Sequence, residues 1–96
     1  MATVIPASGE PREITPGNGR EFTLAELQGI VGGYIEGLRA PDGRWLFVNE
    51  DGKRLELPYN QGATLLMISR LQFGDFIVGD VVLCSAIEAG ADDADA

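Results

Sequence analysis

Turn and cap residues recur at short intervals between residues 31 and 60, and this segment constrains the fold more than any other. Glycine, proline, asparagine and aspartate gather there in four places. These residue types favour turns and the ends of helices and strands. The four places are Gly32-Gly33, Pro41-Asp42-Gly43, Asn49-Glu50-Asp51-Gly52 and Leu57-Pro58-Tyr59-Asn60. The stretches between them are β-prone, so the segment predicts short strands joined by tight turns.

Three stretches of this segment predict the strands of an antiparallel meander. Residues 34–39 alternate between apolar and polar positions, residues 44–48 read Arg-Trp-Leu-Phe-Val, and residues 53–57 alternate again. Two tight turns join these stretches in order along the chain, which is the pattern of a meander. The sequence therefore predicts three neighbouring strands in one sheet.

The middle stretch places apolar side chains on both faces of that sheet. Trp45 and Phe47 share one face, and Leu46 and Val48 share the other. A sheet with two apolar faces must be covered on both, by the helices or by another subunit. An exposed Trp45 would be a suitable anchor for such an interface. We therefore predict a homodimer in which Trp45 lies at the interface.

Two helices are expected from their cap residues. Thr23, with Glu26 three positions later, has the spacing of a capping box. An apolar stripe follows at helical spacing, and Gly32-Gly33 ends it because glycine tolerates the left-handed conformation of a helix C-terminus. Asn60 is the expected N-cap of a second helix over residues 61–70.

The two ends of the chain complete the predicted fold. Residues 3–5 and 12–15 are β-prone and flank a turn, which predicts an N-terminal hairpin. Residues 76–85 read as two extended segments hinged at Gly79-Asp80. The prediction is one α+β domain over residues 1–88: an antiparallel β-meander sheet with two helices and the hairpin. Residues 89–96 lack large apolar groups and predict a disordered acidic tail.

Charge and composition argue against several classes of partner. The 96 residues carry seven basic and fifteen acidic side chains, a formal net charge of −8. An acidic surface repels phosphate backbones and anionic lipids, so we expect neither direct nucleic-acid binding nor membrane binding. No basic and apolar leader precedes the hairpin, and the apolar stretch over residues 76–87 is too short to span a bilayer. We predict a cytoplasmic protein.

The chemical groups of the chain point away from the common catalytic and metal sites. Histidine is absent, which excludes a histidine-based triad. The single cysteine, Cys84, lies in an apolar run and reads as a buried, inert thiol. Residues 49–52 resemble a calcium loop, but Phe47 and Pro58 stand where ligands are required. We expect no metal and no cofactor.

The order of the motifs resembles a known family. The chain carries Val31-Gly32-Gly33-Tyr34-Ile35-Glu36, then Asn49-Glu50-Asp51-Gly52, then Leu57-Pro58-Tyr59-Asn60, and last Gly74-Asp75-Phe76-Ile77-Val78-Gly79-Asp80-Val81-Val82-Leu83. In this order the motifs resemble a domain-of-unknown-function family of small proteins from bacteriophages, plasmids and other mobile elements. The resemblance covers roughly residues 22–84. It implies an α+β domain of mobile-element origin and no established activity.

Five polar residues are the candidate binding residues. Tyr34 and Glu36 share one face of the first predicted strand, Asn49 and Glu50 follow the second, and Asn60 follows the third. We expect them to converge at one end of the sheet, where they would suit a small polar ligand or the backbone of a partner. The structural alternative gives Asn49 to a turn, Asn60 to a helix cap, and Glu36 to an ion pair with Arg39 or Arg44.

These observations favour a binding protein over an enzyme. The leading hypothesis is a non-enzymatic phage or mobile-element accessory protein that binds a host protein or a small nucleotide-like molecule stoichiometrically, with a counter-defence role. One alternative is an acidic inhibitor that mimics nucleic acid. The other is a hydrolase that uses a pair of carboxylates, for which the candidates are Glu36 together with Glu50 or Asp51.

Overall fold

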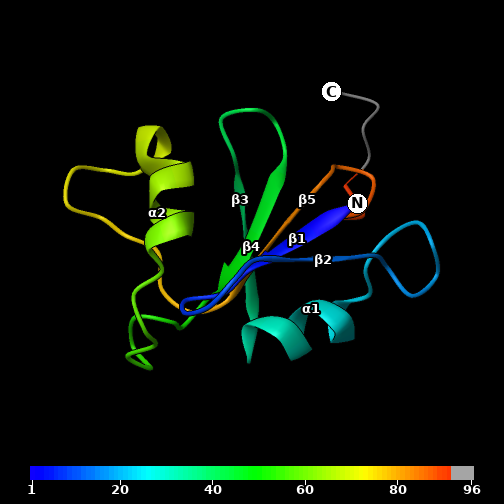
Figure 1. Cartoon of the computed structure of the whole chain (residues 1–96), viewed down its shortest axis with the longest axis horizontal. Helices are drawn as coiled ribbons and strands as arrows, with labels where there is room; N and C mark the ends of the chain where they lie inside the picture. The colour runs from blue at the N-terminus through cyan, green and yellow to red at the C-terminus, as the bar shows by residue number, and fades with distance from the viewer. Residues whose placement is uncertain (92–96) are drawn as a thin grey trace.

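Five antiparallel strands form one sheet in the order β2-β1-β5-β4-β3 in the computed structural model, which describes residues 1–91 (Figure 1). Two α-helices accompany the sheet, and the predicted α+β class is confirmed. The elements are β1 (Ala2–Ile5), β2 (Arg12–Ile14), α1 (Leu24–Val31), β3 (Ile35–Arg39), β4 (Trp45–Asn49), α2 (Gln61–Met67), the 3₁₀-helix η1 (Ile68–Arg70) and β5 (Val81–Cys84).

The predicted N-terminal hairpin and the predicted caps of the first helix are confirmed. β1 and β2 form the expected antiparallel hairpin, with Ala2 opposite Ile14. α1 begins with a complete capping box, in which the Thr23 side chain accepts from the Glu26 N–H and the Glu26 carboxylate accepts from the Thr23 N–H. It ends at Gly32, whose φ of 84° lies in the left-handed region that glycine tolerates.

The β3–β4 hairpin is also confirmed, but the third strand of the predicted meander is wrong. Residues 51–56 form successive turns, and the N–H of Leu55 bonds to the carbonyl of Asp51 at 2.9 Å, as in a helical turn. Glu56 adopts a positive φ of 56°, which a regular strand does not allow. The side of β4 that the third strand would have occupied is taken by β5.

β5 is the central strand of the sheet. It pairs with β1 on one side and with β4 on the other, and all four of its residues are buried. A strand covered on both faces needs an unbroken apolar run, which residues 81–84 supply and the charged residues 53–57 do not. Of the two extended segments predicted here, only the second is a strand, because the first contributes a single bridge between Tyr59 and Val78. Gly79, with a φ of 79°, separates the two.

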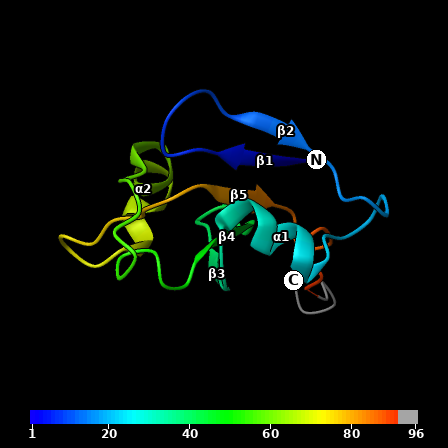
Figure 2. The ribbon, with the colours of Figure 1, turned by 90° about the horizontal axis from the view of Figure 1, so that it is seen from below.

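Each face of the sheet is covered by one helix, as the apolar pattern of β4 requires. α1 packs on the face that carries Phe47 and Val82, and α2 packs on the face that carries Leu46 and Val48. Figure 2 shows the two helices at different ends of the sheet. Trp45 is half-buried on the α1 face, where it packs against the core cluster that contains Leu27 of α1. The homodimer itself stays a prediction.

The second helix begins at its predicted N-cap, and its last turn tightens. Asn60 caps α2, and the predicted range of residues 61–70 is divided between α2 and η1. At the other end of the chain, Glu88 is buried and the N–H of Ala91 bonds to the carbonyl of Ala86. The folded body thus extends through the first residues of the predicted tail. Residues 92–96 of that tail lie outside the described residues.

Candidate ligand-binding groove

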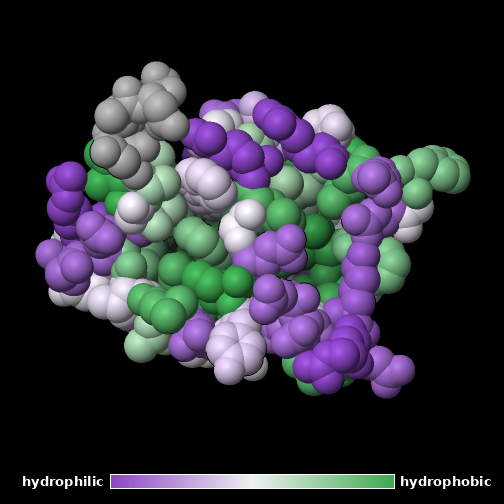
Figure 3. Space-filling model, turned by 180° about the vertical axis from the view of Figure 1, so that it is seen from behind, coloured by the Kyte–Doolittle hydropathy of each residue, from purple (hydrophilic) through white to green (hydrophobic). Residues whose placement is uncertain are grey.

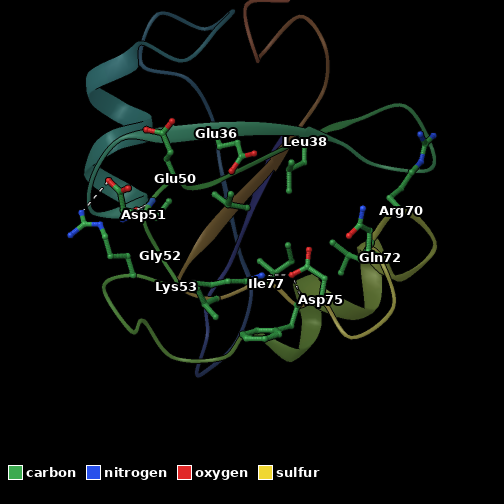
Figure 4. Close-up of a pocket in the computed structure, with 16 residues that line it drawn as sticks. Glu36, Leu38, Glu50, Asp51, Gly52, Lys53, Arg70, Gln72, Asp75 and Ile77 are labelled. Atoms are coloured by element: carbon green, nitrogen blue, oxygen red, sulfur yellow. Dashed lines mark hydrogen bonds and ion pairs between the residues drawn. The ribbon is translucent and has the colours of Figure 1, made fainter.

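A groove of about 460 Å³ opens on the α2 face of the sheet. Three stretches of chain line it: the paired strands β3 and β4, the turns over residues 50–54, and the segment of residues 70–78 (Figure 4). Its apolar lining includes Leu38, Val48, Ile77 and Val78, which form the floor. Its polar rim consists of Glu36, Glu50, Asp51, Lys53, Arg54, Arg70, Gln72 and Asp75.

Strand periodicity places Glu36 on this groove. Glu36 lies opposite Val48 in the β3–β4 ladder, and Leu38 follows on the same face two residues later. Figure 4 shows the Glu36 carboxylate directed toward the centre of the hollow. The ion pair with Arg39 or Arg44 is not formed, since Arg44 pairs with Asp42 at 2.8 Å and Arg39 lies over the Trp45 ring at 4.9 Å.

The turn after β4 is held by the buried side chain of Asn49. Its Nδ2 donates to the carbonyl of Val31 at 3.1 Å, and its Oδ1 accepts from the N–H of Asp51 at 2.8 Å. The amide therefore ties the end of α1 to this turn and has both of its polar atoms occupied. Its effect on the groove is to place Glu50 and Asp51 at the rim, where Figure 4 shows them.

An ion pair closes one side of the groove. Lys53 bonds to the carboxylate of Asp75, and its ammonium also lies 4.6 Å from the centre of the Phe76 ring. The hydrogen bond from Lys53, followed by that from the N–H of Phe76, holds the pKa of Asp75 below its usual value. Lys53 and Asp75 thereby connect two loops that are distant in sequence. Arg54 is similarly close to Asp51, at 3.5 Å.

The five candidate residues divide into two groups. Glu36, Asn49 and Glu50 line the groove together, whereas Tyr34 and Asn60 do not. Tyr34 is 68% exposed outside the groove. Asn60 is fully buried, and its side chain bonds to the N–H of Ala63 and to the carbonyls of two other segments, so its role is structural.

The sequence prediction missed the third wall of the groove. Arg70, Gln72 and Asp75 reach the rim from the segment that follows α2. The only available signal was the pair of turn residues Gly74-Asp75, which indicates a loop but does not say which surface the loop faces.

The described residues contain no cluster of three or more histidine, cysteine or acidic side chains placed to hold a metal ion. Cys84 is buried, and its burial raises the pKa of its thiol to about 12. None of the helices seen in residues 1–91 has the length and apolar character needed to cross a bilayer.

Together, these features define a small α+β domain with one helix on each sheet face and an open groove on one of them. The chain belongs to the family described as domain of unknown function (DUF3846), whose model matches residues 2–95. This match confirms the resemblance to an uncharacterised domain family. Comparison with curated proteins and comparison with solved structures gave no match.

Proposed function

We propose that this chain is a cytoplasmic, non-enzymatic accessory protein of a phage or another mobile element. It would act by stoichiometric binding of a host protein or a small nucleotide-like molecule, with a counter-defence role. The observation that carries this proposal is the groove, with its apolar floor and polar rim. The mobile-element origin rests on the order of the sequence motifs.

The composition of the groove supports binding. Ligand sites in proteins combine concave apolar surface with a few polar groups that fix orientation, in volumes of roughly 300–1,000 Å³. The groove has about 460 Å³ and combines Leu38, Val48 and Ile77 below with charged groups of both signs above. Such a surface can bury an apolar group while its rim selects for charge.

The groups available to the groove support binding over turnover. The chain has no histidine, and its one thiol is buried and held in its protonated form. Lys53 is engaged with Asp75 and does not lie free at the rim. A serine–histidine or cysteine–histidine pair therefore cannot form at this site.

Native mass spectrometry of the protein purified from host cells tests the proposal. The expected result is a retained partner or small molecule in a fixed ratio. Gln72→Trp places an indole at the exposed rim of the groove and should abolish retention of the bound species. The control is Gln61→Trp, at an exposed position outside the groove, and it should leave retention unchanged. A fully folded protein with no retained species under any host condition would contradict stoichiometric binding.

A carboxylate-dependent hydrolase is the second candidate, because Glu36 and Glu50 both line the groove. This candidate requires that Glu36→Gln still binds substrate and no longer turns it over. Loss of binding together with activity would refute it.

The nucleic-acid mimic is less favoured, because the rim carries basic as well as acidic side chains. Its test is a truncation that starts at residue 92, since Glu88 belongs to the folded body. Unchanged inhibition of a nucleic-acid-binding target after that truncation would exclude the tail as the mimic.

A further inference from the structure

The outer side of β3 offers unpaired backbone groups. β3 pairs with β4 and with no other described strand. At its two ends the N–H of Glu50 bonds to the carbonyl of Tyr34 and the N–H of Ala40 bonds to the carbonyl of Arg44, both at 2.8 Å. In an antiparallel ladder, every second residue of a strand bonds to the neighbouring strand. Residues 34 and 40 bond toward β4, so the even-numbered residues between them do the same. The N–H and C=O groups of residues 35, 37 and 39 therefore face outward.

Three of the usual obstacles to another strand are missing from this edge. Residues 35–39 contain no proline and no lysine, and their register with β4 runs without a bulge. Gly37, at the centre, is exposed and presents no side chain. On the inner side its place is filled by the rings of Trp45 and Phe47, which a Cβ at Gly37 would meet at 3.2–3.3 Å. At the centre of the edge, aromatic rings therefore pack against one face of the backbone, and the outer side is open to solvent.

The same strand forms one wall of the groove, so the open edge and the groove are one continuous surface. Leu38 contributes to the apolar floor and Glu36 to the rim. Seen from behind, on the side of β3, apolar surface occupies the middle of the molecule and hydrophilic residues surround it (Figure 3). A chain laid along this edge would project alternate side chains over the groove.

Charge indicates what such a chain would carry. Neither Glu36 nor Glu50 has an ion-pair partner within residues 1–91, whereas Lys53 and Arg54 are both paired with carboxylates of the rim. Arg39 of β3 lies over the Trp45 ring and donates to the carbonyl of Gly43, so it is engaged on the opposite face of the sheet. Arg70 also lines the groove, but from the segment after α2. The whole chain has a net charge of −8. On the groove side of β3 the nearest charges without a partner, Glu36 and Glu50, are thus negative, and they attract basic side chains and repel anionic ones.

We propose that the β3 edge docks an extended, basic segment of a partner protein, which adds to the sheet as a sixth strand. Main-chain bonds to residues 35, 37 and 39 would supply affinity, and alternate side chains would supply specificity. One of them, a lysine or arginine, would face Glu36, and an apolar one would lie against Leu38. This inference rests on the proposed function and selects a host protein over a nucleotide-like molecule as the partner.

A capped eight-residue peptide tests the proposal; it carries lysine and valine in turn at its odd positions and threonine at its even positions, so that lysine and valine share one face two residues apart, as Glu36 and Leu38 do. A glutamate–valine peptide, with glutamate in place of each lysine, is the control of opposite charge. Binding is measured by fluorescence anisotropy and by amide chemical-shift changes in β3. Two further lysine–valine peptides carry N-methyl groups on alternate amides, one on each edge of the strand. In a strand, only one set of amides faces β3, so one methylated peptide should lose binding and the other should retain it.

Glu36→Lys and the matched control Glu13→Lys test the charge argument. Both residues are exposed on edge strands, and Glu13 lies on β2 at the far edge of the sheet. Glu36→Lys should lower the affinity of the protein for the lysine–valine peptide about fivefold or more. Glu13→Lys should leave this affinity unchanged. Unchanged thermal midpoints would show that both variants fold.

Three outcomes would each overturn the proposal. The two methylated peptides could bind with equal affinity, the two lysine variants could change peptide affinity equally, or the glutamate–valine peptide could bind more tightly than the lysine–valine peptide. Light scattering that shows a dimer whose β3 amides are already protected would also overturn it, because a second copy would then occupy the edge. If the peptides fail but native mass spectrometry finds a small molecule that Gln72→Trp removes, the proposed function stands and only the strand-docking inference falls.

Discussion

Replacing Asn60 by alanine should destabilise the fold far more than the loss of one exposed cap would. Asn60 is fully buried at the start of α2. Its Oδ1 accepts from the N–H of Ala63 at 3.0 Å, while its Nδ2 donates to the carbonyl of Ile5 at 2.9 Å and to that of Gly79 at 2.8 Å. One amide thus joins α2 to the end of β1 and to the turn before β5.

The expected cost follows from these three bonds. Loss of an N-cap acceptor costs about 1 kcal/mol. Each carbonyl left without its donor costs about 1 kcal/mol more, because the bond to Gly79 is buried and the bond to Ile5 is partly buried, so water replaces them poorly. Asn60→Ala should therefore lower the free energy of unfolding by about 3 kcal/mol, a large share of the roughly 5–15 kcal/mol of a typical domain.

Urea unfolding followed by circular dichroism measures this loss. With a slope of about 1 kcal/mol per molar, the midpoint should fall by roughly 3 M. Asn18→Ala is the matched control, because the Asn18 side chain also accepts bonds, from the N–H groups of Arg20 and Glu21, but at an exposed site. It should cost about 0.5 kcal/mol. Equal shifts for the two variants would refute the argument that burial sets the cost.

Three further predictions concern single side chains. The hydrogen bond from the N–H of Thr23 lowers the pKa of Glu26 from 4.5, so its contribution to stability is present above that pH and is lost as the pH falls through the folded pKa. Thermal melts should show a deficit for Glu26→Gln at neutral pH that shrinks as the pH falls into the acidic range. Cys84, with its pKa raised to about 12, should resist a thiol reagent at about pH 8 and react once denatured; fast labelling of the folded protein would contradict this. Thr64→Val removes the acceptor that bonds the buried N–H of Ile77 at 2.9 Å and should cost about 1–3 kcal/mol in urea unfolding, so a loss as small as that of a surface substitution would count against it.

Features that depend on a few neighbouring residues could be predicted from the sequence. The capping box of Thr23 and Glu26, the end of α1 at Gly32 and the turn between β3 and β4 all formed as expected. Each involves groups no more than four residues apart, so the local sequence contains the whole interaction. The same holds for Asn60 as the N-cap of α2.

The neighbour of β4 could not be predicted in this way. Residues 53–57 alternate and follow β4 at once, which favoured them over the distant residues 81–84. The sheet nevertheless takes β5 into its centre, since a strand there is covered on both faces and must be apolar throughout. The charged side chains of Lys53, Arg54 and Glu56 stay exposed only if that segment leaves the sheet.

The candidate site shows the same division. The alternation along β3 singled out Glu36, which does line the groove, together with Tyr34, which does not. It was not sufficient to separate Asn60, whose polar atoms are used inside the fold, from the residues of the rim. Nor could it bring Asp75 to Lys53, because their contact depends on how two loops 22 residues apart come together.

The sequence by itself determined the segments that become helices, hairpins and turns, because caps, glycines and side-chain alternation act over one or two turns of chain. Tertiary structure decided the order β2-β1-β5-β4-β3, the position of β3 at an open edge, and the groove beside it. Those features follow from which apolar faces can be buried together, and that balance is settled only when all the segments pack at once.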